Sequence, residues 1–190
     1  MKVATTILLT IVAGVASGLA YVYSGAFDVA ADEPHGPLAH WLLDTTRERS
    51  IAIRAKAIEV PNLDAPELIE DGAAEYAEMC AGCHLAPGVA DNEFRKGLNP
   101  PAPKLAERLQ GGASGATARQ FWIVKHGIKM TAMPAWGLTH DDPTIWSIVA
   151  FLQKLPELTP QQYAQMTEDA ASAHEESGHG HAHDATEDRL

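Results

Sequence analysis

Both cysteines of the 190-residue chain lie in one short segment, Cys80-Ala81-Gly82-Cys83-His84. Two thiols three positions apart at the end of a helix can each add to one vinyl group of the same porphyrin. The adjacent histidine then supplies a nitrogen ligand to the iron, and this spacing is the attachment motif of c-type haem. The motif therefore predicts one covalently bound haem c, held by Cys80 and Cys83, with His84 as an axial iron ligand.

Two other interpretations of a Cys-x-x-Cys pair require different surroundings. A dithiol redox pair is expected next to a strand-helix unit, and the flanking residues show no strand pattern. A structural zinc site needs two more ligands at metal-site spacing, but the chain has no second cysteine pair. Haem attachment is therefore the favoured interpretation.

A haem iron in an electron carrier needs a sixth ligand, and methionine raises its reduction potential. Met133 precedes Pro134 in a loop between two expected helices, and the proline stiffens that loop. Met130 is the second candidate in this loop, and His126 and His140 are less favoured alternatives. An iron with two protein ligands has no open position for a substrate, so we expect a protein that is not an enzyme.

Further segments accompany the attachment motif in a characteristic order. They are Gly72-x-x-x-Tyr76-x-x-x-Cys80, Phe121–Gly127, Met133–Gly137 and Ile148–Lys154. Together with the attachment motif, they resemble the class I mono-haem cytochromes c over residues 66–156. These are small bacterial electron carriers with His/Met ligation. The resemblance implies an all-α cytochrome c fold of about four short helices around one haem.

The resemblance also implies roles for individual residues. Met133 matches the distal iron ligand of the family. Gly72 matches the position at which the first and last helices cross closely, with Tyr76 and Phe151 packing at the crossing. The resemblance therefore predicts a ligand at Met133 and a close helix crossing at Gly72.

In the same family, a proline carbonyl in the loop after the motif accepts a hydrogen bond from the ligand histidine. Pro103 fits this role best, with Pro100 and Pro101 as alternatives. Such a bond fixes the imidazole ring and tunes the iron. Trp122 and Trp136 could donate their indole N–H groups toward the haem propionates, with core packing as an equal alternative for both.

An uncharged run extends from Val3 to Phe27, preceded by Lys2. It exceeds the roughly 20 residues that a helix needs to cross a bilayer core. We expect residues 1–27 to form a membrane anchor, and a cleaved secretory signal is the alternative. The rest of the chain is then exported. It faces the periplasm at the bacterial inner membrane, or is soluble in the periplasm if the segment is cleaved.

The remaining chain divides into three expected parts. Residues 28–61 hold a polar linker and an additional helix at 38–58, and residues 62–158 form the cytochrome c domain. No run alternates with the period of a strand, so the domain is predicted to be all-α. Its helices are expected at 65–79, 104–110, 117–126 and 141–155.

Residues 159–190 form an acidic, histidine-rich tail, which we expect to be disordered because it holds few large apolar residues. Its histidines could bind a divalent metal such as copper, nickel or zinc, although incidental affinity is the favoured interpretation. They are His174, His179, His181 and His183. The formal net charge of −11 argues against a nucleic-acid partner, because binding to phosphates requires basic side chains.

The combined expectation is electron transfer by a single haem c with His/Met axial ligation. The chain would act as a carrier or as a subunit of a redox complex, with donor and acceptor proteins as partners. A haem-based sensor is the alternative, in which Met133 dissociates to admit a small ligand.

Overall fold

The structure is a computed structural model that describes residues 2–107 and 114–178. Over these two ranges every regular element is a helix and none is a strand, which confirms the predicted all-α class. The chain divides into two compact units, residues 1–35 and 36–190. The predicted cytochrome c domain, residues 62–158, lies within the second unit.

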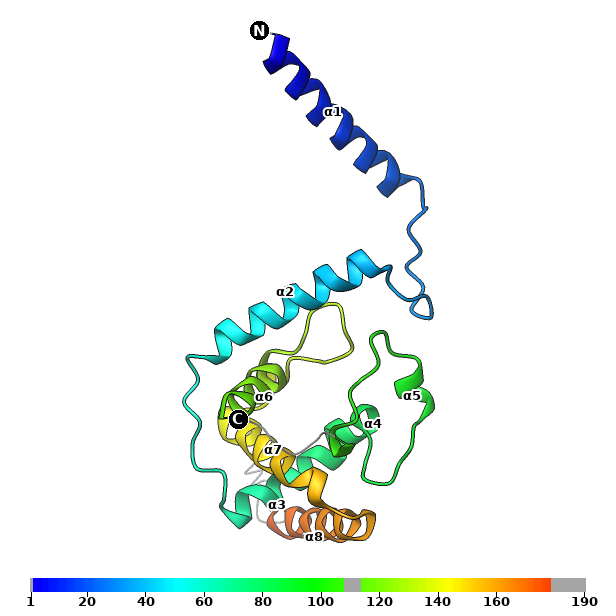
Figure 1. Cartoon of the computed structure of the whole chain (residues 1–190). Helices are drawn as coiled ribbons and strands as arrows, with labels where there is room; N and C mark the ends of the chain where they lie inside the picture. The colour runs from blue at the N-terminus through cyan, green and yellow to red at the C-terminus, as the bar shows by residue number, and fades with distance from the viewer. Residues whose placement is uncertain (1, 108–113, 179–190) are drawn as a thin grey trace, which may run out of the picture. The chain divides into compact units, whose positions relative to one another are not determined.

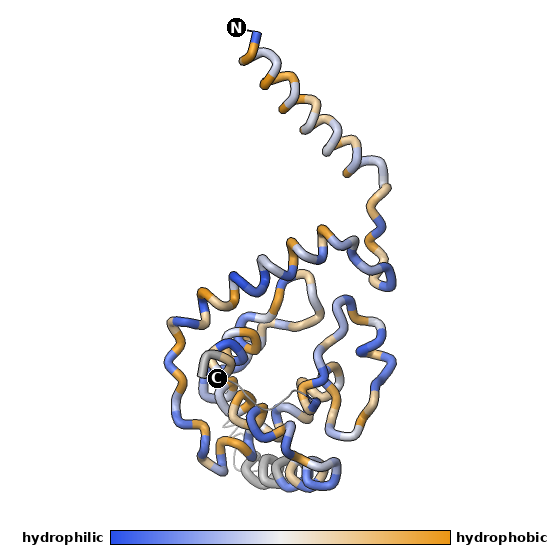
Figure 2. The backbone as a smooth tube through the Cα atoms, viewed as in Figure 1, coloured by the Kyte–Doolittle hydropathy of each residue, from blue (hydrophilic) through white to orange (hydrophobic). Residues whose placement is uncertain are grey.

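The first unit contains helix α1, Lys2–Tyr23, which has no buried residue. Its 22 residues rise about 33 Å, close to the roughly 30 Å of a bilayer core. Hydrophobic residues recur along its whole length (Figure 2). The hydroxyls of Thr6 and Thr10 each donate to the carbonyl four residues earlier, at 3.0 Å, so they are satisfied within the helix. By length and composition, α1 is able to cross a membrane.

The second unit begins with helix α2, Pro37–Ala55, which has a proline in its first turn. The helix matches the one expected at 38–58. It packs against α6, Ser114–His126, as Figure 1 shows. Ile51 and Ala55 are the buried residues of α2, so its C-terminal half is the part most firmly seated on the unit.

Two long helices of the core begin at the proline positions that the sequence marks. Pro66 opens α3 and Pro143 lies in the first turn of α7. Asp141 caps α7 by accepting the backbone N–H of Thr144 at 3.0 Å, as expected of an N-cap aspartate. The elements of this unit after α2 are α3 (Pro66–Glu75), η1 (Tyr76–Cys80), α4 (Ala81–His84), α5 (Glu93–Lys96), η2 (Leu105–Glu107), α6, η3 (Trp136–Leu138), α7 (Asp142–Lys154), η4 (Leu155–Glu157) and α8 (Pro160–Gly178).

Two details differ from the expected helices. Helix α5 was not predicted, because four residues are too few to give a periodic pattern. In place of the helix expected at 104–110, the described part of that segment holds only the 3-10 turn η2, Leu105–Glu107. Residues 108–113 lie outside the described ranges.

Helices α3 and α7 cross closely, as the resemblance implies. A Cβ atom at Gly72 would overlap the backbone carbonyl of Ser147, so only glycine fits at the crossing. The rings of Tyr76 and Phe151 pack beside it, with their centroids 5.4 Å apart. Both residues are fully buried, and this contact anchors the hydrophobic core.

Replacement of Gly72 by alanine is expected to destabilise the fold, because the added methyl group meets backbone that cannot rotate away. Overpacking of this kind costs about 1–3 kcal/mol, and we expect the upper end. Thermal unfolding of the haem-loaded chain measures the change. Gly36→Ala is the control, since its Cβ would meet nothing within 4 Å. Equal unfolding midpoints for the two variants would contradict the close crossing.

Helix α8 corrects the predicted disordered tail, because residues 160–178 are helical. Thr159 and Gln162 form a reciprocal cap: the side chain of Gln162 accepts the N–H of Thr159 at 2.9 Å, and Thr159 Oγ1 accepts the N–H of Gln162 at 3.2 Å. Tyr163 is buried, with its ring centroid 6.3 Å from those of Tyr76 and Phe151. One capped turn and one buried aromatic therefore seat the helix.

The tail histidines that were considered as metal ligands are not covered by the structure. His179, His181 and His183 lie outside the described residues, and so does the side chain of His174. Their metal binding stays a prediction.

Candidate cofactor-binding site

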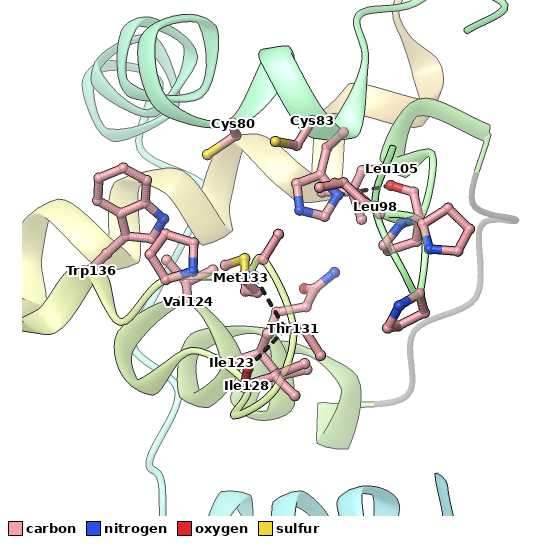
Figure 3. A pocket seen from close by; sticks show the side chains of 18 of the residues that line it. Cys80, Cys83, Leu98, Leu105, Ile123, Val124, Ile128, Thr131, Met133 and Trp136 are labelled. Atoms are coloured by element: carbon pink, nitrogen blue, oxygen red, sulfur yellow. Dashed lines mark hydrogen bonds between the residues drawn. The ribbon is translucent and has the colours of Figure 1, made fainter. Parts of the chain in front are cut away.

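A cavity of about 610 Å³ opens in the second unit and is lined by Cys80, Cys83, His84 and Met133. Its volume falls within the roughly 300–1,000 Å³ that is usual for cofactor and small-molecule sites. Figure 3 shows the sulfur atoms of Cys80 and Cys83 at one side, with Met133 across the space from them. Residues from the attachment motif and from the methionine loop are therefore brought to one place.

The attachment motif is built by a change of helix type. Helix α3 runs directly into the π-helical turn η1, which ends at Cys80, and α4 then carries Cys83 and His84. A π-turn re-aims the side chains that follow it and often marks a functional site. Cys80 is buried, Cys83 is partly buried, and both are free thiols.

The thiol of Cys80 is held in its neutral form. Burial, together with smaller contributions from the nearby Glu75 and Cys83, raises the pKa of this thiol to about 12. At neutral pH the Cys80 thiol is therefore in its neutral form.

The chain turns sharply just after His84. Leu85 has φ of 65° and ψ of 152°, a conformation that costs a residue other than glycine about 1–3 kcal/mol. The side chain of Leu85 is buried, and the hydroxyl of Tyr76 donates to its carbonyl oxygen at 2.7 Å. Tyr76 therefore supports the turn that ends the motif. Sequence reasoning assigned it only a packing role, because the hydrogen bond depends on tertiary structure.

The imidazole of His84 is oriented by the loop that follows the motif. Its Nδ1 lies 2.8 Å from the carbonyl oxygen of Pro103. A carbonyl can only accept, so Nδ1 carries the proton and Nε2 is the unprotonated nitrogen of the ring. The hydrogen bond that the resemblance implies is thus present at Pro103. Pro100 and Pro101 line the cavity as well.

Helix α5 ties the proline loop to the attachment motif. Asn92, its N-cap residue, donates from Nδ2 to the carbonyl of Gly82 at 2.9 Å. Arg95 donates from Nε to the carbonyl of Ala102 at 2.7 Å and forms an ion pair with Asp91. The residue before Pro103 is therefore fixed from the same helix that contacts the motif.

A compact turn holds Met133. Thr131 Oγ1 accepts the N–H of Met133 at 3.1 Å and donates to the carbonyl of Ile128 at 2.8 Å. The N–H of Ile128 donates to the carbonyl of Met133 at 3.2 Å. At Gly127, with φ of 64°, a Cβ would lie 2.7 Å from the same carbonyl. Met130 is 84% exposed and does not line the cavity.

The two predicted tryptophans lie in different places. Trp136 lines the cavity, whereas Trp122 does not. The ring of Trp122 packs against His126, with their centroids 5.0 Å apart. His140 is hydrogen-bonded to Thr139 at 2.8 Å, and neither histidine lines the cavity.

Sequence reasoning missed several side chains that line the cavity, among them Met79, Arg47, Glu48 and Arg119. Met79 lies next to Cys80 in the chain, but its place on the wall depends on the π-turn. Arg47 and Glu48 come from α2, outside the predicted cytochrome domain. No local pattern linked α2 to the motif, because the link depends on how α2 packs on α6.

The side chains around the cavity fit a covalently attached haem. They supply two free thiols, an imidazole whose Nδ1 contacts the carbonyl of Pro103, a thioether and a largely apolar wall. Across residues 2–107 and 114–178, no group of three or more His, Cys, Asp and Glu side chains is placed to hold a metal ion. The fit to haem rests on the two thiols, the imidazole and the thioether that line one cavity.

Comparison with known proteins points to one family. Residues 67–152 match the family described as cytochrome C oxidase, cbb3-type, subunit III. A cbb3-type cytochrome c oxidase subunit FixP from Sinorhizobium medicae (strain WSM419) is 33% identical over 92 residues, covering 47% of this chain and 28% of the relative. The subunit of the same name from Rhizobium meliloti (strain 1021) is 27% identical over 143 residues. This match covers 74% of this chain and 44% of the relative. No solved structure matches the chain.

The chain spans less than half of the length of either relative. The comparisons nevertheless correct the expectation that the protein is not an enzyme. The matching family and both relatives are described as subunits of cytochrome c oxidase, which is an enzyme complex. That expectation rested on an iron with no open position, but an electron-transfer subunit can serve an enzyme whose chemistry takes place elsewhere.

Proposed function

We propose that the chain carries single electrons as a haem c subunit of a cbb3-type oxidase or a similar redox complex, because residues 67–152 match the cbb3-type subunit III family. One haem is attached by Cys80 and Cys83. Each S–H adds across a vinyl group, which forms a C–S bond and places the hydrogen on the second vinyl carbon, so no oxidant or reductant is consumed. The single observation that best supports this proposal is that both thiols, His84 and Met133 line one cavity.

His84, through Nε2, and Met133, through its sulfur, would hold the iron of the bound haem. The carbonyl of Pro103 fixes the imidazole ring and makes it a better donor. When bound, haem supplies a reversible one-electron couple, and a methionine ligand keeps its potential high. Trp136, on the cavity wall, contacts the cofactor. Trp122 packs away from the cavity wall, which favours a packing role for it.

Helix α1 anchors the chain in the bacterial inner membrane, and the cytochrome domain faces the periplasm. This proposal is supported by the length and apolar composition of α1 and by the description of both relatives as oxidase subunits. Retention at the membrane keeps the carrier near its redox partners and limits the distance that it diffuses.

Reaction with carbon monoxide tests the electron carrier against the haem sensor. The full chain, expressed with haem-attachment machinery, is expected to titrate as a single one-electron couple. Its reduced form is expected not to bind carbon monoxide at neutral pH, because both axial positions are filled. Met133→Leu is the positive control, since loss of the thioether opens one position. Stoichiometric binding of carbon monoxide by the wild type would favour the sensor.

A further inference from the structure

Helices α2 and α6 bring a cluster of four charged side chains to the cavity. Arg119 Nη2 donates hydrogen bonds to both carboxylate oxygens of Glu48, at 2.7 and 2.6 Å. Arg47 bonds to Asp44, and to Glu48 at 3.3 Å. Arg47, Glu48 and Arg119 all line the cavity. Two cations are thus held at its wall by carboxylates of α2.

Neither guanidinium is saturated by these contacts. Arg47 and Arg119 are only 34% and 26% exposed at their side chains. Their Nη1 atoms have no hydrogen-bond partner within the part of the chain that the structure describes. A guanidinium carries five N–H donors in a planar fork that matches a carboxylate. Each arginine can therefore donate a further hydrogen bond to an anionic oxygen of a ligand in the cavity.

Arg47 and Arg119 reach the cavity wall from α2 and α6, whereas the two cysteines reach it from η1 and α4. In Figure 3 the two cysteines are above the space, and the α2 ribbon, in pale blue, passes below it. Haem has its two vinyl groups toward one edge of the ring and its two carboxylates at the opposite edge. A haem that reacts with Cys80 and Cys83 through its vinyl edge presents its carboxylates toward the far side of the cavity.

We propose that Arg47 and Arg119 bind the two haem carboxylates, and that Glu48 positions both arginines. The inference rests on the proposed function, since it requires a haem in the cavity. It makes α2, which lies outside the segment that matches the cytochrome family, part of the haem-binding unit. It also gives the ion pair between α2 and α6 a role beyond holding the helices together.

The charges in this cluster set the reduction potential. Reduction adds one negative charge to the haem, and a cation beside the carboxylates stabilises the reduced form more than the oxidised form. Loss of Arg47 or Arg119 therefore lowers the potential, whereas loss of the negative charge of Glu48 raises it. Opposite signs distinguish an electrostatic role from general loosening of the fold, which would shift the three variants in the same direction.

The test is a spectroelectrochemical titration of the full haem-loaded chain. Arg47→Gln and Arg119→Gln are each expected to shift the equilibrium roughly tenfold toward the oxidised form, which is about 59 mV for a one-electron couple. Glu48→Gln is expected to shift it toward the reduced form. Arg49→Gln is the matched control: it removes the same charge from α2 at an exposed position that does not line the cavity. We expect its shift to be twofold or less.

The inference is wrong if the Arg47 and Arg119 variants shift the potential no more than Arg49→Gln does. It is also wrong if Glu48→Gln shifts it in the same direction as the arginine variants. Arg119→Lys keeps the positive charge, so its potential is expected to lie at least halfway back from that of Arg119→Gln to that of the wild type. This variant also keeps the test decisive if Arg119→Gln folds poorly. Haem staining after denaturation separates the two proposals, because a wild-type chain without bound haem contradicts the proposed function itself.

Discussion

The Cys80→Ala, Cys83→Ala double variant is expected to lose all covalently bound haem. Both thiols line the cavity beside His84, and the chain has no other cysteine. The measurement is haem staining of the denatured chain, followed by extraction with acidified organic solvent. Wild-type haem is expected to stay with the protein, and any haem that the double variant takes up is expected to be extracted.

The single variants provide the matched controls for this experiment. Cys80→Ala and Cys83→Ala each keep one thiol and His84, so each is expected to retain haem through one thioether bond with a lower yield. Alanine is suitable at both positions because it introduces no polar group at the buried Cys80. Haem that resists extraction from the double variant would show that the attachment point lies elsewhere in the chain.

Met133→Leu is expected to produce the second large effect, a fall in reduction potential on the order of 0.1 V or more. Axial ligands set haem potentials over a range of about 0.8 V, and methionine lies toward the high end. Leucine nearly conserves the volume of methionine, so the change removes the sulfur and leaves the packing similar. The weak far-red absorption band from sulfur to ferric iron is expected to disappear.

Met130→Leu is the matched control, because Met130 lies in the same loop but is exposed and outside the cavity. Its potential and spectrum are expected to equal those of the wild type. The opposite pattern, with loss of the far-red band in Met130→Leu alone, would assign the sixth ligand to Met130. An unchanged spectrum in both variants would direct attention to Met79, which also lines the cavity.

The sequence predicted the centre of the site because its determinants are local. The spacing of Cys80, Cys83 and His84 is a covalent requirement of the porphyrin, and Met133 lies in a short loop with its own turn contacts. Gly72 was identified from the resemblance, and the overlap of its Cβ with Ser147 gives the physical reason. The attachment motif and the turn that holds Met133 depend on few distant residues, so the sequence alone can reveal them.

The wall of the cavity was less predictable, because it depends on packing between distant segments. Arg47 and Glu48 reach the cavity only because α2 packs on α6, where Arg119 meets Glu48. Tyr76 supports Leu85 through a hydrogen bond that no periodic pattern encodes. Helix α8 was missed as well. The tail holds few large apolar residues, and the burial of Tyr163 against Tyr76 and Phe151 depends on tertiary packing.

The most direct test of the central claim is a peptide map of the wild-type chain by mass spectrometry. The chain is expressed with haem-attachment machinery, denatured, digested and separated from any free haem. We expect one haem on the peptide that contains Cys80, Cys83 and His84, with no free thiol remaining at either cysteine. Two unmodified thiols in that peptide, or haem on a different peptide, would contradict it.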